Sequence, residues 1–345
     1  MPYISMTRRG ILMTGAALVP FGCSAAPNPV NDAPESIGKW RPGTALPFAV
    51  QEIYPTLHNG KIHLAGGFVS DGDSISGVTE RHVIFDPATE AWTDSIPLPT
   101  ARHHPNLISF QGKLLAIGGF QAESEQAVWV MQPGVWVFDG SAWADGPSLP
   151  HPNGESVMGV LGAALHVCGG RTPSGTSNQS WNDHTDIGDH FVLNSLDNDW
   201  VRAAPLPTAR NSAAAAVIGS DWHVVGGRTV ADGNTPAHEV YDVREDRWRT
   251  AAPMPQGQGG LAAASLDGKL YAFGGEFFNN GGGVYPEAWM YDSATDTWTA
   301  LPDMPHPRHG LGAVVLGDEI HVIGGALRVG GSQTSNLVEV FEPSA

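Results

Sequence analysis

The feature that most constrains the fold of this chain is a unit of about fifty residues that recurs six times. Each unit contains a short apolar run that ends in two glycines, as in KIHLAGG and EIHVIGG. The glycine pairs begin at Gly66, Gly118, Gly169, Gly226, Gly274 and Gly324. In the first five units a tryptophan follows the second glycine after 21 to 30 residues, at Trp92, Trp143, Trp200, Trp248 and Trp298. Such self-similarity indicates a repeated supersecondary unit.

Each unit has room for four short strands, which is the composition of one β-propeller blade. Paired glycines allow two backbones to approach where a Cβ would clash, and the tryptophan supplies a wedge between blades. The last unit lacks its tryptophan strand, but the segment KWRPGTALP near the N-terminus aligns Trp40 with Trp92. We therefore expect an all-β, six-bladed propeller over residues 36–345, closed by an N-terminal strand that completes the C-terminal blade.

The glycine pair, the Asp-containing hairpin turn and the spaced tryptophan together resemble the kelch repeat, over nearly all of residues 36–345. The resemblance implies a kelch propeller. It does not settle the function, because kelch propellers include adaptors, oxidases and isomerases.

The N-terminal 26 residues resemble an export signal. Arg8 and Arg9 precede an apolar run over residues 11–19, as in twin-arginine signals of bacteria. Cleavage after Ala26 and a lipid anchor on Cys23, within FGCS, are alternative ends. Residues 27–35 would then be a linker. We expect a periplasmic or secreted protein, which is either free or anchored by a lipid on Cys23. The mature chain is expected to have no transmembrane segment.

The composition excludes some partners. The formal net charge is −17, which disfavours nucleic acid and anionic membranes. Cys168 lies in the apolar run ALHVCGG, so we expect a buried, inert thiol.

Two positions in each blade are expected to line a central pocket. In kelch adaptors of ubiquitin ligases, ligands contact the residue after the turn arginine and the residue after the glycine pair. The resemblance assigns ligand binding to an asymmetric set, which is apolar on one side and charged on the other: Gln51, His103, Asn211, His309, Phe68, Phe120, Arg171 and Arg228. Arg102, Arg210 and Arg308 hold the turn position itself, and we interpret them as structural.

One position further along, blades four to six have Ser212, Gly260 and Gly310, whereas blades one to three have Glu52, His104 and Glu155. An imidazole between carboxylates suits proton transfer. A tolerant, solvated strand end is the alternative interpretation. Together with Glu276, the candidate catalytic residues are Glu52, His104, Glu155 and Glu276.

The segment SWNDHTDIGDHF has the longest spacing between a glycine pair and its tryptophan, so it is expected to overhang the pocket. Asn182, Asp186 and His190 resemble the iron motif of plant nitrile-specifier proteins, but asparagine stands where that motif has glutamate. His82, His190 and His238 share one position in three blades, which favours a place on the third strand. We expect a polar lid, with no metal and no cofactor.

These residues favour an exported propeller that binds a small polar or anionic ligand. The chain resembles the periplasmic sialic acid mutarotases, which implies acid–base isomerisation of a sugar acid, with Arg171 and Arg228 holding its carboxylate. The alternative is a non-catalytic envelope module that binds a protein or glycan. A metal-dependent kelch enzyme is a lesser alternative.

Overall fold

The computed structural model describes residues 37–344, and these residues form a β-protein with two single-turn 3-10 helices, η1 (Trp181–Asp183) and η2 (Asn279–Gly281). The export signal, Cys23 and the linker over residues 27–35 lie outside the described residues. No helix in the described range is both long and apolar enough to cross a bilayer.

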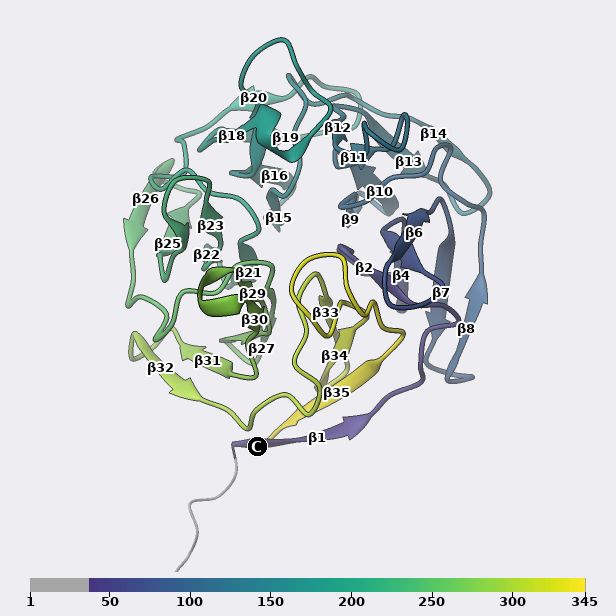
Figure 1. Cartoon of the computed structure of the whole chain (residues 1–345). Helices are drawn as coiled ribbons and strands as arrows, with labels where there is room; N and C mark the ends of the chain where they lie inside the picture. The colour runs from purple at the N-terminus through teal and green to yellow at the C-terminus, as the bar shows by residue number, and fades with distance from the viewer. Residues whose placement is uncertain (1–36, 345) are drawn as a thin grey trace, which may run out of the picture. The chain divides into compact units, whose positions relative to one another are not determined.

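The strands build six antiparallel four-stranded sheets, which are the blades (Figure 1). From the innermost strand outward, blade 1 consists of β3 (Thr56–His58), β4 (Lys61–Ala65), β7 (His82–Asp86) and β8 (Ala91–Asp94). Blade 2 consists of β9 (Asn106–Phe110), β10 (Lys113–Ile117), β13 (Val135–Phe138) and β14 (Trp143–Asp145). Blade 3 consists of β15 (Val157–Leu161), β16 (Ala164–Cys168), β19 (His190–Leu193) and β20 (Val201–Arg202). Blade 4 consists of β21 (Ala214–Ile218), β22 (Asp221–Val225), β25 (His238–Asp242) and β26 (Arg247–Thr250). Blade 5 consists of β27 (Ala262–Leu266), β28 (Lys269–Phe273), β31 (Ala288–Asp292) and β32 (Thr297–Ala300). Blade 6 consists of β33 (Gly312–Leu316), β34 (Glu319–Ile323), β35 (Val338–Pro343) and β1 (Gly38–Pro42).

The innermost strands contact one another around a circle: β3 with β9, then β15, β21, β27, β33 and back to β3. The predicted all-β architecture of repeated blades is confirmed. The N-terminal strand β1 pairs antiparallel with β35, so that Trp40 lies opposite Phe341 in the blade that also contains Gly324.

The repeated tryptophan joins each blade to the preceding one. Its indole Nε1 donates a hydrogen bond to a backbone carbonyl just after the preceding blade's outer strand. The six bonds, of 2.7–3.0 Å, are Trp40 to Pro302, Trp92 to Thr44, Trp143 to Ile96, Trp200 to Pro147, Trp248 to Ala204 and Trp298 to Ala252. The polar edge of a large apolar side chain is thereby satisfied within the interface between blades.

The hydrophobic core lies between neighbouring blades. One cluster joins Leu115 and Val135 of blade 2 to Val167 and Phe191 of blade 3. Cys168 belongs to the next such cluster and is fully buried, and burial raises its thiol pKa far above the usual value. The predicted inert thiol is therefore consistent with its surroundings.

The turn position stabilises each glycine pair. Arg102, Arg210 and Arg308 donate to the carbonyl of the first glycine of their own blade, at 2.8–3.0 Å. Asn153 and Gln258 make the same bond in blades 3 and 5. These contacts agree with a structural role for the three arginines.

The glycine pair itself is required by close approach. Gly226 has a φ of +62°, and a Cβ there would lie 2.6 Å from the carbonyl oxygen of Gln258. A side chain at this position would therefore be both strained and obstructed.

After each glycine pair, the chain of blades 1 to 5 forms a small sheet on one face of the propeller, which we call the hairpin face. These sheets are β2 (Val50–Gln51), β5 (Phe68–Ser70), β6 (Ile75–Val78); β11 (Phe120–Gln121), β12 (Val130–Met131); β17 (Arg171–Pro173), β18 (His184–Asp186); β23 (Arg228–Thr229), β24 (Gly233–Asn234); and β29 (Glu276–Phe277), β30 (Gly283–Val284).

Candidate functional site

Two sets of residues that the sequence assigned to one face are direct neighbours in the structure. In every blade the residue after the turn position pairs with the residue after the glycine pair. The pairs are Gln51–Phe68, His103–Phe120, Gly154–Arg171, Asn211–Arg228, Gly259–Glu276 and His309–Ala326. The predicted positions therefore meet around the centre of the hairpin face.

The next residue of each blade has a left-handed backbone. The φ values lie between 50° and 71° at Glu52, His104, Glu155, Ser212, Gly260 and Gly310. Five of these six amides donate to the carbonyl of the equivalent residue in an adjacent blade: Glu52 to Gly310, His104 to Glu52, Ser212 to Glu155, Gly260 to Ser212 and Gly310 to Gly260. The backbone thus forms a narrow central ring. Glycine adopts this conformation without steric cost, which accounts for Gly260 in blade 5 and Gly310 in blade 6.

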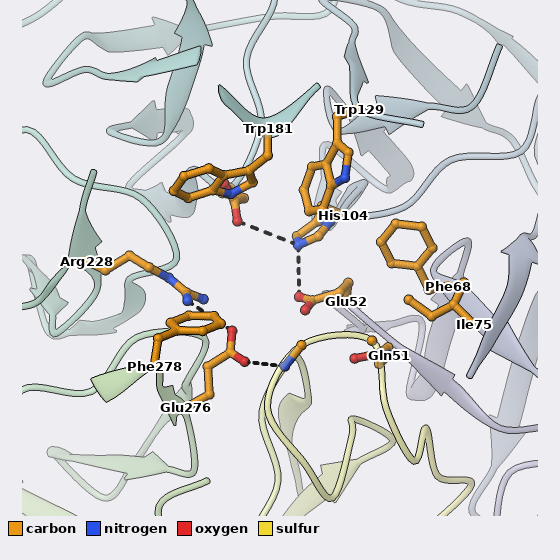
Figure 2. Close-up of a pocket in the computed structure, with 13 residues that line it drawn as sticks. Gln51, Glu52, Phe68, Ile75, His104, Trp129, Trp181, Arg228, Glu276 and Phe278 are labelled. Carbon is orange, nitrogen blue, oxygen red and sulfur yellow. Dashed lines mark hydrogen bonds and ion pairs between the residues drawn. The ribbon is translucent and has the colours of Figure 1, made fainter. Parts of the chain in front are cut away.

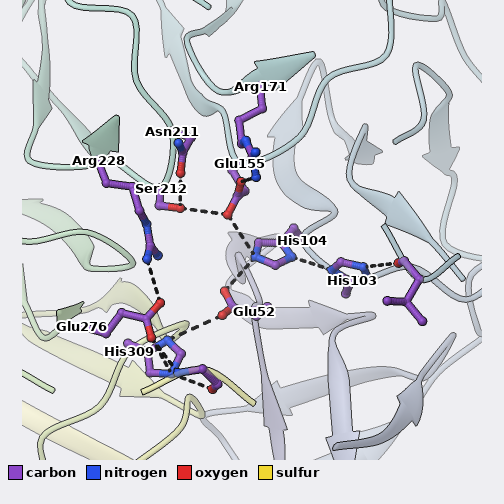
Figure 3. A network of polar contacts seen from close by, with 12 residues as sticks. Glu52, His103, His104, Glu155, Arg171, Asn211, Ser212, Arg228, Glu276 and His309 are labelled. Atoms are coloured by element: carbon purple, nitrogen blue, oxygen red, sulfur yellow. Dashed lines mark hydrogen bonds and ion pairs between the residues drawn. The ribbon is translucent and has the colours of Figure 1, made fainter. Parts of the chain in front are cut away.

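His104 lies between two carboxylates at the floor of the site (Figure 3). Its Nε2 is 2.8 Å from Oε2 of Glu52 and 3.8 Å from Oε1 of Glu155. Burial disfavours the imidazolium, but the two carboxylates outweigh it and raise the pKa of His104. Burial also disfavours ionised Glu52, but His104, His309 and Arg228 lower its pKa to about 2. His104 and Glu52 therefore form a buried ion pair.

The second nitrogen of His104 supports the same protonation state. His103 Nε2 lies 2.8 Å from the carbonyl of Val128 and so donates a proton to it. Burial lowers the pKa of His103 far below its usual value, so this ring is neutral and its Nδ1 is an acceptor. His104 Nδ1, at 2.7 Å, must then donate to His103. With Nε2 donating to Glu52, both nitrogens of His104 carry protons.

Glu276 joins two blades by a second ion pair. Its Oε1 accepts from Arg228 Nη1 at 2.9 Å, and its Oε2 accepts from the backbone amide of Gly330 at 2.8 Å. Burial lowers the pKa of Arg228, but Glu276, Glu155 and Glu52 raise it further than burial lowers it. The guanidinium is a permanent cation beside the cavity.

Arg171, which the sequence assigned to ligand binding, is fully buried and does not line the cavity in this structure. Its side chain is 0% exposed. Its Nη2 donates to the backbone carbonyl of Trp181 at 2.6 Å, its Nη1 lies 3.5 Å from Glu155, and its guanidinium packs 4.0 Å from the centre of the Trp181 ring. Arg171 therefore supports the cavity wall from behind.

These groups surround a cavity of about 460 Å³ (Figure 2). Of the predicted residues, Gln51, Glu52, Phe68, His104, Glu155, Arg228 and Glu276 line it. The remaining five predicted residues, His103, Phe120, Arg171, Asn211 and His309, are buried behind the lining. His103, for example, is stacked between Phe68 and Phe120, with ring centres 3.9 and 5.0 Å away.

The mouth of the cavity is mainly apolar, which sequence reasoning did not identify. Ile75, Trp129, Trp181 and Phe278 line it together with Gly330 and Gly331. Phe278 is 62% exposed, and its ring lies over Arg228. A signal was present: Trp129 and Trp181 fall outside the repeated tryptophan position, between a glycine pair and the third strand of a blade.

The loop between β17 and β19 does not bring the three weak metal candidates together as a site. His190 begins β19 and hydrogen-bonds to His166 and to the carbonyl of Ala204. Asp186 accepts from Asn211 and from the amide of Val230, and Asn182 is exposed on η1. Within residues 37–344, no group of three or more His, Cys, Asp or Glu side chains is arranged to hold a metal ion. The residue that this loop contributes to the cavity lining is the aromatic Trp181.

Comparisons with known proteins agree with this architecture. Residues 144–325 match the family model described as the KLHDC2/KLHL20/DRC7 Kelch-repeats domain. The chain is 28% identical to the Kelch-like protein terF of Aspergillus terreus over 232 residues, which cover 65% of this chain and 49% of that protein. It is 33% identical to Kelch-like protein 35 of Mus musculus over 141 residues, covering 41% and 22%.

Beta-scruin of Limulus polyphemus is 27% identical over 185 residues, covering 52% of this chain and 19% of that protein. The matches thus span about half or less of these relatives' own lengths. The family model itself covers more than half of this sequence, and its boundaries enclose four of the six glycine pairs. The chain therefore belongs to the kelch-repeat family.

Proposed function

We propose that this protein is a non-catalytic binding module that docks a partner protein on its hairpin face, with an uncharged apolar side chain of the partner in the central cavity. The observation that carries this proposal is the combination of an aromatic mouth with a floor whose charges are paired with one another. Membership in the kelch-repeat family supports a protein-interaction role.

The charge balance of the floor favours an uncharged occupant. Three carboxylates, of Glu52, Glu155 and Glu276, face three cations, of His104, Arg171 and Arg228. A charged ligand would have to compete with one of these pairs after losing its own hydration, which is costly in a buried site. An apolar group loses no such interactions and gains contact with the rings at the mouth.

The same balance disfavours a sugar acid. Of the two arginines that the sequence assigned to an anion, only Arg228 lines the cavity, and it is already paired with Glu276. A general base is most effective when its pKa lies near the working pH. The pKa of Glu52 is about 2, so this carboxylate is a weak base.

The test is a selection of random displayed peptides on the purified wild-type protein. Enriched peptides are then titrated against a cavity variant, Trp129→Ala with Phe278→Ala. Val201→Ala is the matched control, because Val201 is an exposed apolar residue on the outer strand β20, away from the cavity. Loss of one buried aromatic contact, about 1.5–3 kcal/mol, corresponds to roughly 10- to 100-fold weaker binding.

We expect unchanged binding to Val201→Ala and at least tenfold weaker binding to the cavity variant. Absence of enriched peptides, or peptides that bind the cavity variant as tightly as the wild type, would contradict the proposal.

A second candidate is acid–base isomerisation of a sugar acid, favoured by the protonated His104 on the cavity lining, next to Glu52. In this reaction His104 would protonate the ring oxygen of a cyclic hemiacetal while a carboxylate accepts the anomeric hydroxyl proton. Magnetisation transfer between the anomer signals of N-acetylneuraminate measures it. Catalysed exchange that disappears in His104→Gln would favour this candidate over the binding module, whereas exchange at the uncatalysed rate would exclude it for this substrate.

A further inference from the structure

We infer that the docking partner presents a basic segment, in which lysine or arginine residues flank the apolar side chain that enters the cavity. This inference rests on the proposed binding function and specifies the chemistry of its partner. It comes from four exposed carboxylates in the two hairpins that supply Ile75 and Trp129 to the cavity, which we call the acidic rim: Asp71, Asp73, Glu123 and Glu125.

The acidic rim belongs to the same loops that shape the mouth. Asp71 and Asp73 lie between β5 and β6, and β6 begins with the cavity residue Ile75. Glu123 and Glu125 lie between β11 and β12, just before the cavity residue Trp129. These two hairpins belong to the neighbouring blades 1 and 2, which lie side by side in Figure 1. A segment that fills the cavity would therefore pass close to this rim.

The rim carboxylates form no ion pair within the described residues, whereas some carboxylates elsewhere on the surface do. Within residues 37–344, none of the four forms an ion pair. By contrast, Asp86 pairs with Lys61, and Asp94 with Arg81. Four uncompensated negative charges at a cavity mouth create a field that attracts cations and repels anions.

The interior and the rim therefore select different parts of one partner segment. The charges of the cavity floor are paired with one another, so the inserted side chain is uncharged. The rim is acidic, so the partner residues next to that side chain are cationic. The net charge of −17 acts in the same direction at long range and would speed association with a basic partner.

Two cations of the protein limit where those basic residues lie. Arg228 lines the cavity on blade 4, and Arg328 is exposed in the loop of blade 6, whose residue Gln333 donates its amide to the carbonyl of Asp73 in blade 1. Both would repel a cationic residue. The basic residues of the partner are therefore expected over blades 1 and 2 and not around the whole mouth.

The inference is tested with three blocked synthetic peptides that share a central tryptophan: acetyl-Gly-Gly-Lys-Trp-Lys-Gly-Gly-amide and the two peptides in which serine or glutamate replaces both lysines. Each is titrated calorimetrically against the intact protein at about 0.01 M and about 1 M salt, where the Debye length is about 30 and about 3 Å. The rim variant combines Asp71→Asn, Asp73→Asn, Glu123→Gln and Glu125→Gln. Its control makes the same change of charge at exposed, unpaired residues elsewhere: Asp197→Asn, Asp199→Asn, Asp303→Asn and Asp318→Asn.

At low salt we expect the lysine peptide to bind roughly 3- to 10-fold more tightly than the serine peptide, and the glutamate peptide to bind most weakly. Two exposed ion pairs of about 0.2–1 kcal/mol each correspond to roughly 2- to 30-fold, and the expected preference lies within this range. The preference should disappear at high salt and in the rim variant, and persist in the control variant.

The outcomes separate this inference from the proposed function. If the serine peptide binds and binding is lost in the Trp129→Ala, Phe278→Ala variant, but lysine gives no advantage, the basic-partner inference is wrong and the binding module stands. A lysine preference that survives in the rim variant also overturns the inference. If none of the peptides binds, or if they bind the Trp129→Ala, Phe278→Ala variant as tightly as the wild type, the docking of an apolar side chain in the cavity is itself wrong.

Discussion

The Nε2 atom of His104 lies 2.8 Å from Oε2 of Glu52, and this ion pair connects the central ends of blades 1 and 2. It is reinforced by the backbone, because the amide of His104 donates to the carbonyl of Glu52. Both residues have positive φ values, which side chains other than glycine adopt at some cost in energy. The pair is thus held in a strained central ring where its side chains lie on the cavity lining.

Replacing Glu52 by glutamine should reveal this ion pair as a pH-dependent contribution to stability. The pKa of Glu52 falls from 4.5 to about 2 on folding, so its contribution is present above pH 4.5 and is lost as the pH falls towards 2. The pKa of His104 is raised on folding, so its contribution is present below pH 6.5 and is lost as the pH rises through the folded pKa. The difference between wild type and Glu52→Gln should therefore be largest between about pH 4.5 and 6.5.

We expect that difference to be about 1.5–3 kcal/mol in the free energy of unfolding, as for a hydrogen bond between charged groups. Urea unfolding followed by tryptophan fluorescence at several pH values measures it. Glu80→Gln is the control, because Glu80 is exposed and forms no ion pair within the described chain. A difference that does not vary between pH 6 and pH 3 would mean that the two side chains are not an ion pair.

Three buried histidine pairs should make the protein unstable in acid. His63–His82, His166–His190 and His223–His238 join the second and third strands of blades 1, 3 and 4, with a 2.9 Å separation between Nδ1 and Nε2 in each. In each pair the third-strand ring donates through Nδ1 to a backbone carbonyl, so its Nε2 accepts from its partner and both rings are neutral. Protonation would remove this arrangement.

Burial is the largest cause of the lowered pKa of all six rings. The pKa is about 3 for His63 and His223, and about 4 for His82, His166 and His238. The unfolded chain binds protons at these rings below pH 6.5, whereas the folded chain does not until the pH is far lower. Stability should therefore fall as the pH drops from 6.5 to 4.

The urea midpoint is expected to decrease over this range, and the decrease should be smaller in a variant with His63→Gln, His166→Gln and His223→Gln. A wild-type midpoint that is flat from pH 6.5 to 4 would be incompatible with neutral buried pairs.

The repeated parts of this molecule could be predicted from the sequence because each is specified six times. The glycine pair ends a strand in every blade, and the tryptophan follows at a similar spacing, so one irregular blade does not obscure the pattern. The inner positions were predicted for the same reason. Once the turn residue is aligned across blades, the residues that surround the centre follow by position alone.

The cavity mouth could not be predicted because it is formed by loops that share no period. Trp129 and Trp181 lie in segments of different length, and Phe278 precedes the short helix η2. Arg171 shows a further limit. It occupies the position equivalent to Arg228, but Trp181 of its own loop covers it, so equivalent positions in two blades have different access to the cavity. Side-chain exposure at such positions depends on loop packing, which alignment of repeats does not contain.

Export by the twin-arginine route remains a prediction from residues outside the described range. Changing Arg8 and Arg9 together to lysine should retain the precursor in the cytoplasm, because the route reads this pair. Fractionation of cells that express the two forms measures the outcome. Equal export of the double variant would rule out this route and leave other export routes open.

Completion of the last blade by β1 gives the most direct test of the architecture. Trp40 pairs opposite Phe341, packs with its ring centre 5.4 Å from that of Phe273 in the preceding blade, and donates to the carbonyl of Pro302. Trp40→Phe removes the hydrogen bond together with the five-membered ring but keeps an aromatic contact, and should cost about 1 kcal/mol or somewhat more. Trp40→Ala also removes the apolar contact and should cost about 3 kcal/mol.

Deletion of residues 36–46 should be more severe than either substitution, because it also leaves the edge of β35 unpaired. Trp248→Phe, which removes the equivalent bond to Ala204 between blades 3 and 4, is the internal control. If β1 closes the propeller as an ordinary blade strand, the two Trp→Phe variants will lower the melting temperature by similar amounts. Equal melting temperatures for the wild type and the deletion variant would show that the protein folds without this strand, and the interface between blades 5 and 6 would then have to be stabilised by β33 to β35 alone.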